Sequence, residues 1–250
     1  MLETFLEPNL IWVLLISFIA SLVRSTMGFG ESLVAVPLFL FFLPAEVAVP
    51  LSVMLSVVIA ALILLQDYKK VHFQSAKWLL VYAAIGIPFG VLILIYTNEV
   101  LIKIILGTLL LIYSLYSLFK QSTKLLAEDS KIWLRVCGFL SGVLGGAYGL
   151  NGPPLAIYGH LRQWSAEPFR ATLQAYFLPA SLLGLIGYYA KGLVTTEVNH
   201  YFLWALLTTI PAIYLGRCLN RRIDNVRFFR YVYWGLVGVG ILLISTTVMG

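Results

Sequence analysis

The sequence predicts an all-α polytopic membrane protein with two inverted-topology repeats, each a broken helical hairpin plus three transmembrane helices. Three observations support this prediction: the composition, the lengths of the apolar segments, and an internal repeat. Of the 250 residues, 60% are hydrophobic and 11% are charged, whereas about a quarter are charged in an average soluble domain. A soluble fold of this size cannot bury so many apolar side chains, so we expect lipid to solvate much of the surface.

Six apolar segments come close to the ~20 residues that a helix needs to cross a bilayer. They are residues 47–66, 78–96, 100–119, 169–190, 201–216 and 228–249. Glycine-rich breaks interrupt two further regions: residues 9–23 and 32–43 flank the first break, and residues 132–148 precede the second. At about 1.5 Å per residue each arm covers only about 20 Å, short of the ~30 Å hydrocarbon core. We therefore expect two broken hairpins. Each hairpin either crosses the bilayer fully or re-enters it from one side, and both alternatives stay open.

The second interrupted region repeats the first at a constant offset of 121 residues. Gly28 matches Gly149, and the pair Ala45-Glu46 matches Ala166-Glu167. Self-similarity on this scale is a property of the whole fold. We therefore expect a first transmembrane repeat over residues 1–119, a cytoplasmic linker over 120–131, and a second transmembrane repeat over 132–250.

The basic residues predict the orientation of these repeats. Fourteen of the 17 Lys and Arg residues can face the cytoplasm together, with Lys103 and Lys191 outside and Arg24 in the membrane zone. The segment from residue 47 then begins outside and its repeat partner from residue 169 begins inside, so the halves have opposite orientation. Inverted repeats with interrupted helices indicate the binding site of a secondary transporter. Basic residues in short loops also argue against a nucleic-acid partner.

The two breaks are the predicted binding region. An interrupted helix leaves backbone polar groups unpaired, and these must be satisfied by protein or by a cavity. Gly28 and Gly30 in the first break and Gly152 in the second allow unusual backbone angles, and short helices should start near Glu31 and Pro153. Two helix N-termini that meet within the membrane would form a positive pocket for an anion. The alternative is that the glycines only allow close helix packing.

Arg24 and Glu31 are the ionisable residues that this topology places deep in a segment, where charges are costly and usually functional. We expect the two side chains to be partners across the first break. Arg24 would bind the anion, and Glu31 would orient Arg24 or carry a coupling proton. A purely structural ion pair is the alternative. Their repeat partners are Gly145 and Gly152, so one half should supply all the charge of the pocket.

Three further residues are candidate substrate ligands. Asn151 lies in the second break, where it would donate its amide to an oxyanion or act as a left-handed turn residue. Arg170 and Gln174 are one helical turn apart and share a face. Arg170 is either a ligand or a topology charge at a helix start. Gln174 lies further into an apolar span and should line a cavity.

Other chemistry has little support in the sequence. Cys137 and Cys218 are too few for a disulfide framework or a metal cluster, and the three histidines lack metal-ligand spacing. We expect no catalytic residues, no metal and no cofactor, because the motifs of a membrane-embedded enzyme are missing. A passive anion channel of the same fold is the closer alternative. Glu3 and Glu7 precede the first apolar run, so we expect no cleaved signal peptide and a location in the bacterial inner membrane.

The whole chain resembles the sulfite exporter TauE/SafE family, also called TSUP. The resemblance is carried by Gly28-Phe29-Gly30-Glu31-Ser32-Leu33, by the glycine-rich residues 145–154 that end in Pro153-Pro154, and by Phe169-Arg170-Ala171-Thr172-Leu173-Gln174. It implies a transporter of small anions such as sulfite, organosulfonates or related carboxylates, without enzymatic activity or a bound cofactor. Many members have a longer glycine run where this chain has Glu31. We expect alternating access with proton coupling, and a homodimer is an open alternative to a monomer.

Overall fold

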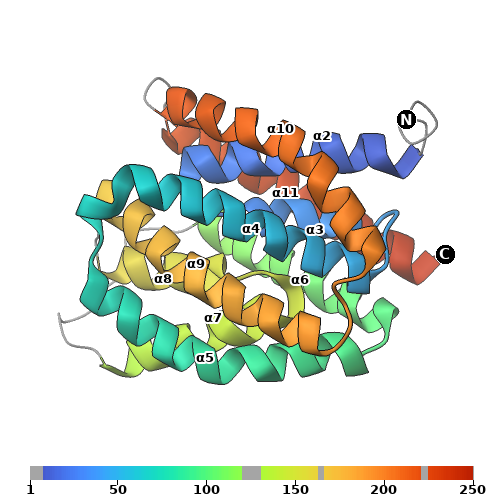
Figure 1. Cartoon of the computed structure of the whole chain (residues 1–250), viewed down its shortest axis with the longest axis horizontal. Coiled ribbons are helices and arrows are strands. Elements are labelled where there is room, and N and C mark those ends of the chain that lie inside the picture. Colours follow the sequence, from blue (N-terminus) through green and yellow to red (C-terminus); the bar gives the residue numbers. More distant parts are fainter. Residues whose placement is uncertain (1–7, 120–130, 163–165, 221–224, 250) are drawn as a thin grey trace.

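The computed structural model describes residues 8–119, 131–162, 166–220 and 225–249, which are helical apart from short connections. The first half contains α2 (Pro8–Met27), α3 (Glu31–Phe39), α4 (Ala45–Asp67), the 3-10 helix η1 (Tyr68–Lys70), α5 (Phe73–Tyr96) and α6 (Glu99–Phe119). The second half contains α7 (Lys131–Tyr148), α8 (Gly152–Leu161), α9 (Ala166–Ala190), α10 (Thr196–Asn220) and α11 (Asn225–Met249). The long helices run roughly along one axis of the molecule (Figure 1).

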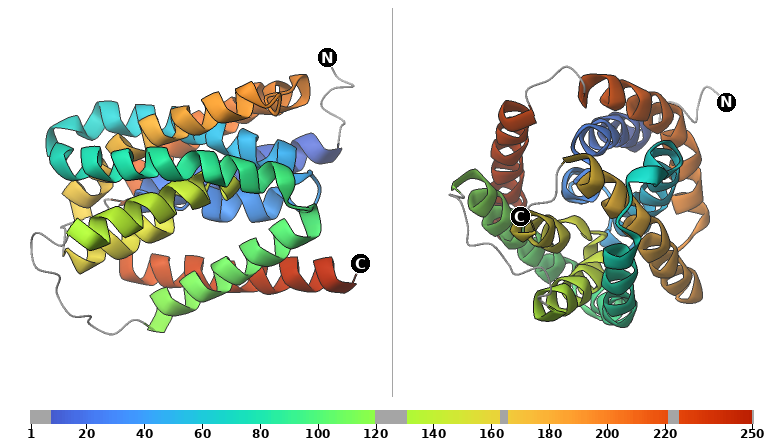
Figure 2. Two further views of the ribbon diagram at one scale, coloured as in Figure 1. Left: turned by 90° about the horizontal axis from the view of Figure 1, so that it is seen from below. Right: turned by 90° about the vertical axis from the view of Figure 1, so that its left-hand side faces the viewer.

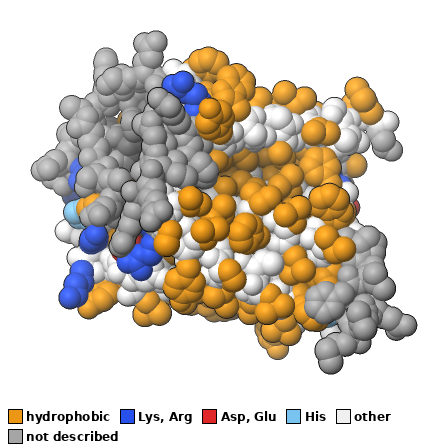
Figure 3. Space-filling view, turned by 90° about the horizontal axis from the view of Figure 1, so that it is seen from above, with side chains coloured by type: hydrophobic (Ala, Val, Ile, Leu, Met, Phe, Trp, Pro, Cys, Tyr) orange, Lys and Arg blue, Asp and Glu red, His pale blue; other side chains and the backbone are white. Residues whose placement is uncertain are grey.

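Seven helices of the described residues are long and apolar enough to cross a membrane. They are Asn9–Met27, Ala45–Lys70, Phe73–Tyr96, Glu99–Phe119, Pro168–Ala190, Thr196–Asn220 and Arg230–Met249. Large apolar side chains such as Ile112, Ile186 and Leu203 are more than half exposed on their outer faces. Figure 3 shows hydrophobic side chains over much of one face and Lys and Arg side chains gathered at one end. The prediction of an all-α polytopic membrane protein is confirmed.

The first helix of the first broken hairpin is longer than predicted. Its predicted end near Val23 is wrong. α2 continues through Arg24 to Met27 and has 20 residues, which is about 30 Å at 1.5 Å per residue. The helix continues because Arg24 and Thr26 have partners within the protein. Arg24 is buried and hydrogen-bonded, and the Thr26 hydroxyl donates to the backbone carbonyl of Leu22 at 2.8 Å. α2 is therefore long enough to cross the membrane.

Helices from the two halves pack against each other in a reciprocal pattern. α5 packs along α7, and α10, which has the same place in the second half, packs along α2. α4 contacts α9, and α6 contacts α11. The end-on view in Figure 2 shows α6 beside α11 on one side of the bundle and α2 beside α10 on another. The element order is the same in both halves, while the boundaries of the repeats and their inverted orientation stay predictions.

Glycines allow α5 and α7 to approach backbone to backbone. A Cβ atom on Gly86 or Gly90 of α5 would overlap the main chain of α7, and one on Gly142 or Gly146 of α7 would overlap the main chain of α5. Small residues spaced four apart are the usual means of close helix packing in membranes. This contact joins the second broken hairpin to the first half, and it positions the second break.

Candidate functional site

Both breaks have the backbone conformation that favours glycine. Gly28, Gly30 and Gly149 have φ angles of 87°, 98° and 68°, in the left-handed region that side chains with a Cβ disfavour. α3 begins at Glu31 and α8 at Gly152, so the predicted helix starts are confirmed within one residue. Gly152 lies close to the first break, because a Cβ there would be in tight contact with the ring of Phe29 at 3.1 Å.

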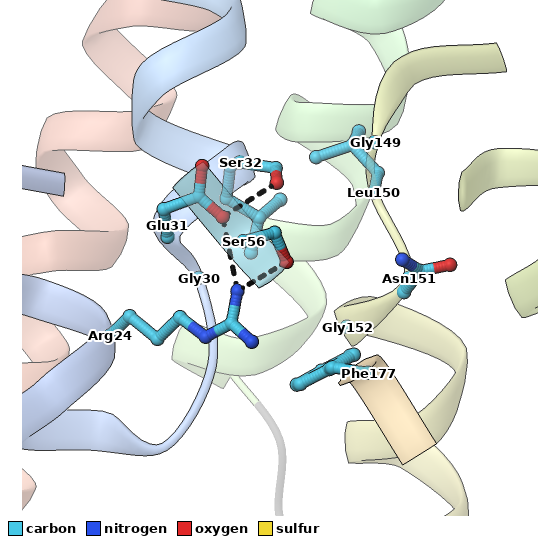
Figure 4. A pocket seen from close by; sticks show the side chains of 11 residues that line it. Arg24, Gly30, Glu31, Ser32, Ser56, Gly149, Leu150, Asn151, Gly152 and Phe177 are labelled. Carbon is cyan, nitrogen blue, oxygen red and sulfur yellow. Dashed lines mark hydrogen bonds and ion pairs between the residues drawn. The ribbon is translucent and has the colours of Figure 1, made fainter. Parts of the chain in front are cut away.

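A cavity with an empty volume of about 260 Å³, its mouth included, lies between the two breaks. The N-terminus of α3 and the second break supply most of its wall, and α2, α4 and α9 supply one residue each. The lining residues are Arg24, Gly30, Glu31, Ser32, Leu33, Ser56, Gly149, Leu150, Asn151, Gly152 and Phe177. Figure 4 shows the charged residues on one side and the second break on the other. The structure therefore brings the two breaks together, as the sequence predicts.

Arg24 on α2 is held by hydrogen bonds from all three guanidinium nitrogens. Nη1 donates to Glu31 Oε2 at 3.1 Å and to Ser56 Oγ at 2.6 Å. Nε and Nη2 donate to Gln174 Oε1 at 3.3 and 2.9 Å. The ring of Phe177 lies 4.7 Å from the guanidinium carbon, a cation–π distance. Only 3% of Arg24 is exposed, so its charge is fixed in position at the cavity wall.

Glu31 at the first turn of α3 is the ion-pair partner of Arg24, as predicted. Its Oε1 accepts a hydrogen bond from Ser52 Oγ at 2.7 Å, and its Oε2 accepts one from Ser32 Oγ at 3.0 Å. The carboxylate is 1% exposed. Burying a charge is tolerable only when it is paired and hydrogen-bonded, and here donors from α2, α3 and α4 meet that need.

Gln174 lies behind Arg24 and does not line the cavity. Its side chain is fully buried on α9. Its Oε1 accepts from Arg24, and its Nε2 donates to the carbonyl oxygen of Gly28 at 2.5 Å. The structure thus places Gln174 as a residue that orients Arg24 and ties α9 to the first break, not as a wall of the cavity.

Arg170 also stays outside the cavity. Its Nε lies 3.6 Å from Asp67 Oδ2 at the end of α4. Its side chain packs on the first break, since a Cβ on Gly28 would lie 2.9 Å from Arg170 Cγ. Arg170 and Gln174 therefore share a face, as predicted, and that face covers Gly28.

Asn151 in the second break lines the cavity opposite Arg24. Its side chain is 5% exposed, and Figure 4 shows the amide nitrogen turned toward the cavity and the oxygen turned away. That oxygen lies against Gly145 and has no hydrogen-bond partner among the described residues. The backbone of Asn151 is fixed by Ser141, whose hydroxyl donates to its carbonyl oxygen at 2.6 Å. This placement makes the amide N–H₂ group available to a molecule in the cavity.

The sequence alone does not single out the serines of the site or Phe177. Ser52 and Ser56 are one turn apart on α4 and both face the charged pair. Two serines four residues apart in an apolar span are the signal that the sequence offers, because they mark one face of the helix. Ser32 was visible only as a member of the first glycine motif. Phe177 had no signal, since an aromatic residue in a membrane helix is ordinary.

The electrostatics of the two helix starts differ. The N–H groups of a first helical turn lack intrahelical partners, and in α3 these belong to Glu31, Ser32 and Leu33, which all line the cavity. In α8 the first turn contains Pro153 and Pro154, which have no N–H group. α3 therefore offers more donors to an anion than α8. Among the described residues no group of three His, Cys, Asp or Glu side chains is placed to hold a metal ion.

The fold and the cavity define a polytopic α-helical membrane protein with a small polar site between two broken hairpins. Residues 13–243 match the model of the family described as Sulfite exporter TauE/SafE, and the chain belongs to that family. This is a family of membrane transporters and not of enzymes, so the protein is a multi-pass membrane transporter. A search of curated proteins and a search of solved structures each found no match.

Proposed function

We propose that this protein is a secondary transporter that moves a small anion across the bacterial inner membrane. The anion is an organosulfonate, sulfite, or a related sulfur-containing or carboxylate anion. The observation that carries this proposal is the buried Arg24 guanidinium at the wall of a cavity that the first turn of α3 also lines. A cation and a helix N-terminus that face one small space favour a negative ligand.

The size and lining of the cavity support a small substrate. Its empty volume of about 260 Å³ includes the open mouth, so the enclosed space is smaller still. Arg24, Ser32 and Ser56 provide donors on one side, whereas Leu33, Leu150 and Phe177 are apolar. A small oxyanion with at most a short apolar group matches this combination.

Alternating access is the mechanism that the arrangement supports best. The cavity lies where two broken hairpins meet, and the hairpins belong to different halves that pack against each other reciprocally. Rocking of one half against the other around such a fixed site is the general mechanism of inverted-repeat transporters. Proton coupling through Glu31 belongs to the same proposal, because Glu31 is the acidic residue at the site.

Thermal unfolding of the detergent-purified protein tests the anion proposal. The probes are sulfite, thiosulfate, methanesulfonate and acetate, and a ligand that binds only the folded state raises the midpoint of unfolding as its concentration rises. We expect one class of these anions to raise the midpoint in the wild type and to have no effect on Arg24→Ala.

Two variants control this experiment. Lys103→Ala removes a cation from the partly exposed pair with Glu99 on α6, and should keep the full ligand response. Arg24→Lys keeps the charge but not the planar donors of arginine. This variant should fold, and it should bind the anion more weakly than the wild type. If none of the four anions shifts the folded wild type, the anion proposal is wrong. For an anion that does bind, uphill accumulation in proteoliposomes under an imposed pH gradient separates a transporter from a passive channel.

A further inference from the structure

The hydroxyl and guanidinium donors at the first break already hold a carboxylate. Ser52 donates to Glu31 Oε1, while Ser32 and Arg24 donate to Oε2, at distances from 2.7 to 3.1 Å. All of these side chains are almost completely buried. Serine hydroxyls and an arginine are also the groups that recognise the oxygens of a sulfonate or a carboxylate.

We infer that the Glu31 carboxylate is an intramolecular competitor of the substrate, which binds at Arg24 only after Glu31 has taken up a proton and left that position. The inference rests on the proposed function and adds to it the charge of the substrate and the stoichiometry. The site takes the anionic group of a monovalent oxyanion, and one proton accompanies each anion.

The donor count at Arg24 favours displacement over simple addition. A guanidinium has five N–H groups. Two of them are directed at Gln174, and Nη1 donates to Glu31 and Ser56. One N–H group of Nη2 is then left for a ligand, which is insufficient for the two-pronged contact that arginine makes with oxyanions. Departure of Glu31 from Nη1 frees the second donor.

The charges at the site require that Glu31 is neutral when it leaves. Of the described residues that line the cavity, only Arg24 and Glu31 are ionisable. α3 packs against α2, α4, α6 and α11. Among the described side chains of these helices only Arg24 brings a charge to the Glu31 carboxylate, while α4 presents the Ser52 hydroxyl. Two anions on one buried guanidinium would repel each other strongly at low dielectric, and an unpaired carboxylate in such a place takes up a proton instead.

The neighbouring hydroxyls can accept the protonated side chain. Ser52 Oγ and Ser32 Oγ are 3.1 Å apart and each lies within 3.0 Å of a Glu31 oxygen. A hydroxyl both donates and accepts, so either serine can turn to accept the proton of the carboxylic acid. Glu31 thus stays hydrogen-bonded in both protonation states.

The resulting cycle is balanced in charge. On the open side one proton from water binds the Glu31 carboxylate, and the anion takes its place at Arg24. After the change of access the anion leaves, the proton returns to water, and the Arg24–Glu31 pair re-forms. The cavity carries no net charge either empty or loaded, so each cycle moves one anion and one proton without net charge.

The test uses anions that carry no proton of their own near neutral pH. Methanesulfonate represents sulfonates and trifluoroacetate represents carboxylates. Wild-type protein in phosphatidylethanolamine and phosphatidylglycerol vesicles, with valinomycin and potassium to set the membrane potential, should take up at least one of them. Uptake should acidify the lumen, as reported by a trapped pH dye, and should not respond to the potential.

The Glu31→Gln variant should still transport the anion but should no longer transport a proton with it. Its uptake should leave the luminal pH unchanged, and its accumulation should change about 50-fold per 100 mV, the factor for one uncompensated charge. Glu99→Gln, at the partly exposed pair with Lys103 on α6, should behave as the wild type. If Glu31→Gln does not fold, the luminal pH in wild-type vesicles still tests whether one proton accompanies each anion.

Three results would overturn the inference. Wild-type uptake of either probe that responds to the potential without luminal acidification would leave the proposed function standing without Glu31 as the competitor. Transport of sulfite but of neither probe would also leave the proposed function standing and would contradict the role of Glu31 as the competitor. If folded wild-type protein transports none of the three anions, the proposed function fails together with the inference.

Discussion

Gln174 of the second half connects Arg24 and Gly28 of the first half through one side-chain amide. Its Oε1 accepts from Arg24 Nη2 at 2.9 Å, and its Nε2 donates to the Gly28 carbonyl oxygen at 2.5 Å. The position of the charge in the first half therefore depends on α9 of the second half. A displacement of α9 relative to α2 would change the anion-binding position directly, which links the site to any movement between the halves.

Gln174→Leu should therefore weaken both folding and anion binding. The substitution leaves the Gly28 carbonyl oxygen and two donor nitrogens of Arg24 without their partner, and an unsatisfied buried polar group costs about 1–3 kcal/mol. We expect a lower midpoint of thermal unfolding and a weaker ligand-induced rise of that midpoint. Gln74→Leu, at an exposed position of α5, is the matched control. Equal effects of the two substitutions would contradict the role of Gln174.

The Arg24–Glu31 pair should be strongly coupled in stability. Removing one partner of a buried pair costs about 3–5 kcal/mol, because the other charge is left uncompensated, whereas replacing both partners costs less. Arg24→Met alone should therefore lower the unfolding midpoint more than the double variant Arg24→Met/Glu31→Gln does. Thermal unfolding in detergent measures both. A double variant that is less stable than the single one would show that the two side chains do not act as a pair.

Most of the fold could be predicted because lipid imposes length and polarity on each segment. The six full-length segments from residue 47 onward correspond to α4, α5, α6, α9, α10 and α11. The end of α2 could not be predicted, because a charged residue in an apolar run is too costly to stay in a membrane segment unless distant residues satisfy it. For Arg24 those residues are Ser56 and Gln174, and the second lies 150 positions away in the chain.

The site was only partly predictable for the same reason. Duplicated breaks and a lone charged pair are local signals, and they identified five of the lining residues: Arg24, Gly30, Glu31, Asn151 and Gly152. Which face of α9 meets the cavity depends on the rotation of that helix against α4, and the sequence pattern of an apolar span does not specify a rotation. The structure consequently has Phe177 at the cavity, Gln174 behind Arg24, and Arg170 beside Asp67.

Gly28→Ala should be more harmful than the same substitution at Gly192. Both glycines have positive φ angles, 87° and 73°, so both variants should lose about 1–2 kcal/mol to backbone strain. A Cβ at Gly28 additionally meets Arg170 Cγ at 2.9 Å, whereas no atom lies within 4 Å at Gly192. The difference between their unfolding midpoints measures that contact. The double variant Gly28→Ala/Arg170→Ala should recover part of the loss, and failure to recover any would argue against the contact.

Gly90→Ala and Gly238→Ala should change stability in opposite directions, although both replace a glycine within a helix. Alanine is favoured over glycine by about 1 kcal/mol in a helix interior, and at Gly238 of α11 no atom lies within 4 Å of the added Cβ, so this variant should unfold at a higher temperature. At Gly90 the Cβ would overlap the Val143 carbonyl oxygen of α7, and the two backbones must separate. Because α7 leads into the second break, the Gly90→Ala variant should also bind its anion more weakly, which titration of the ligand-induced midpoint shift measures. A rise of the midpoint in Gly90→Ala would mean that α5 and α7 are not in backbone contact.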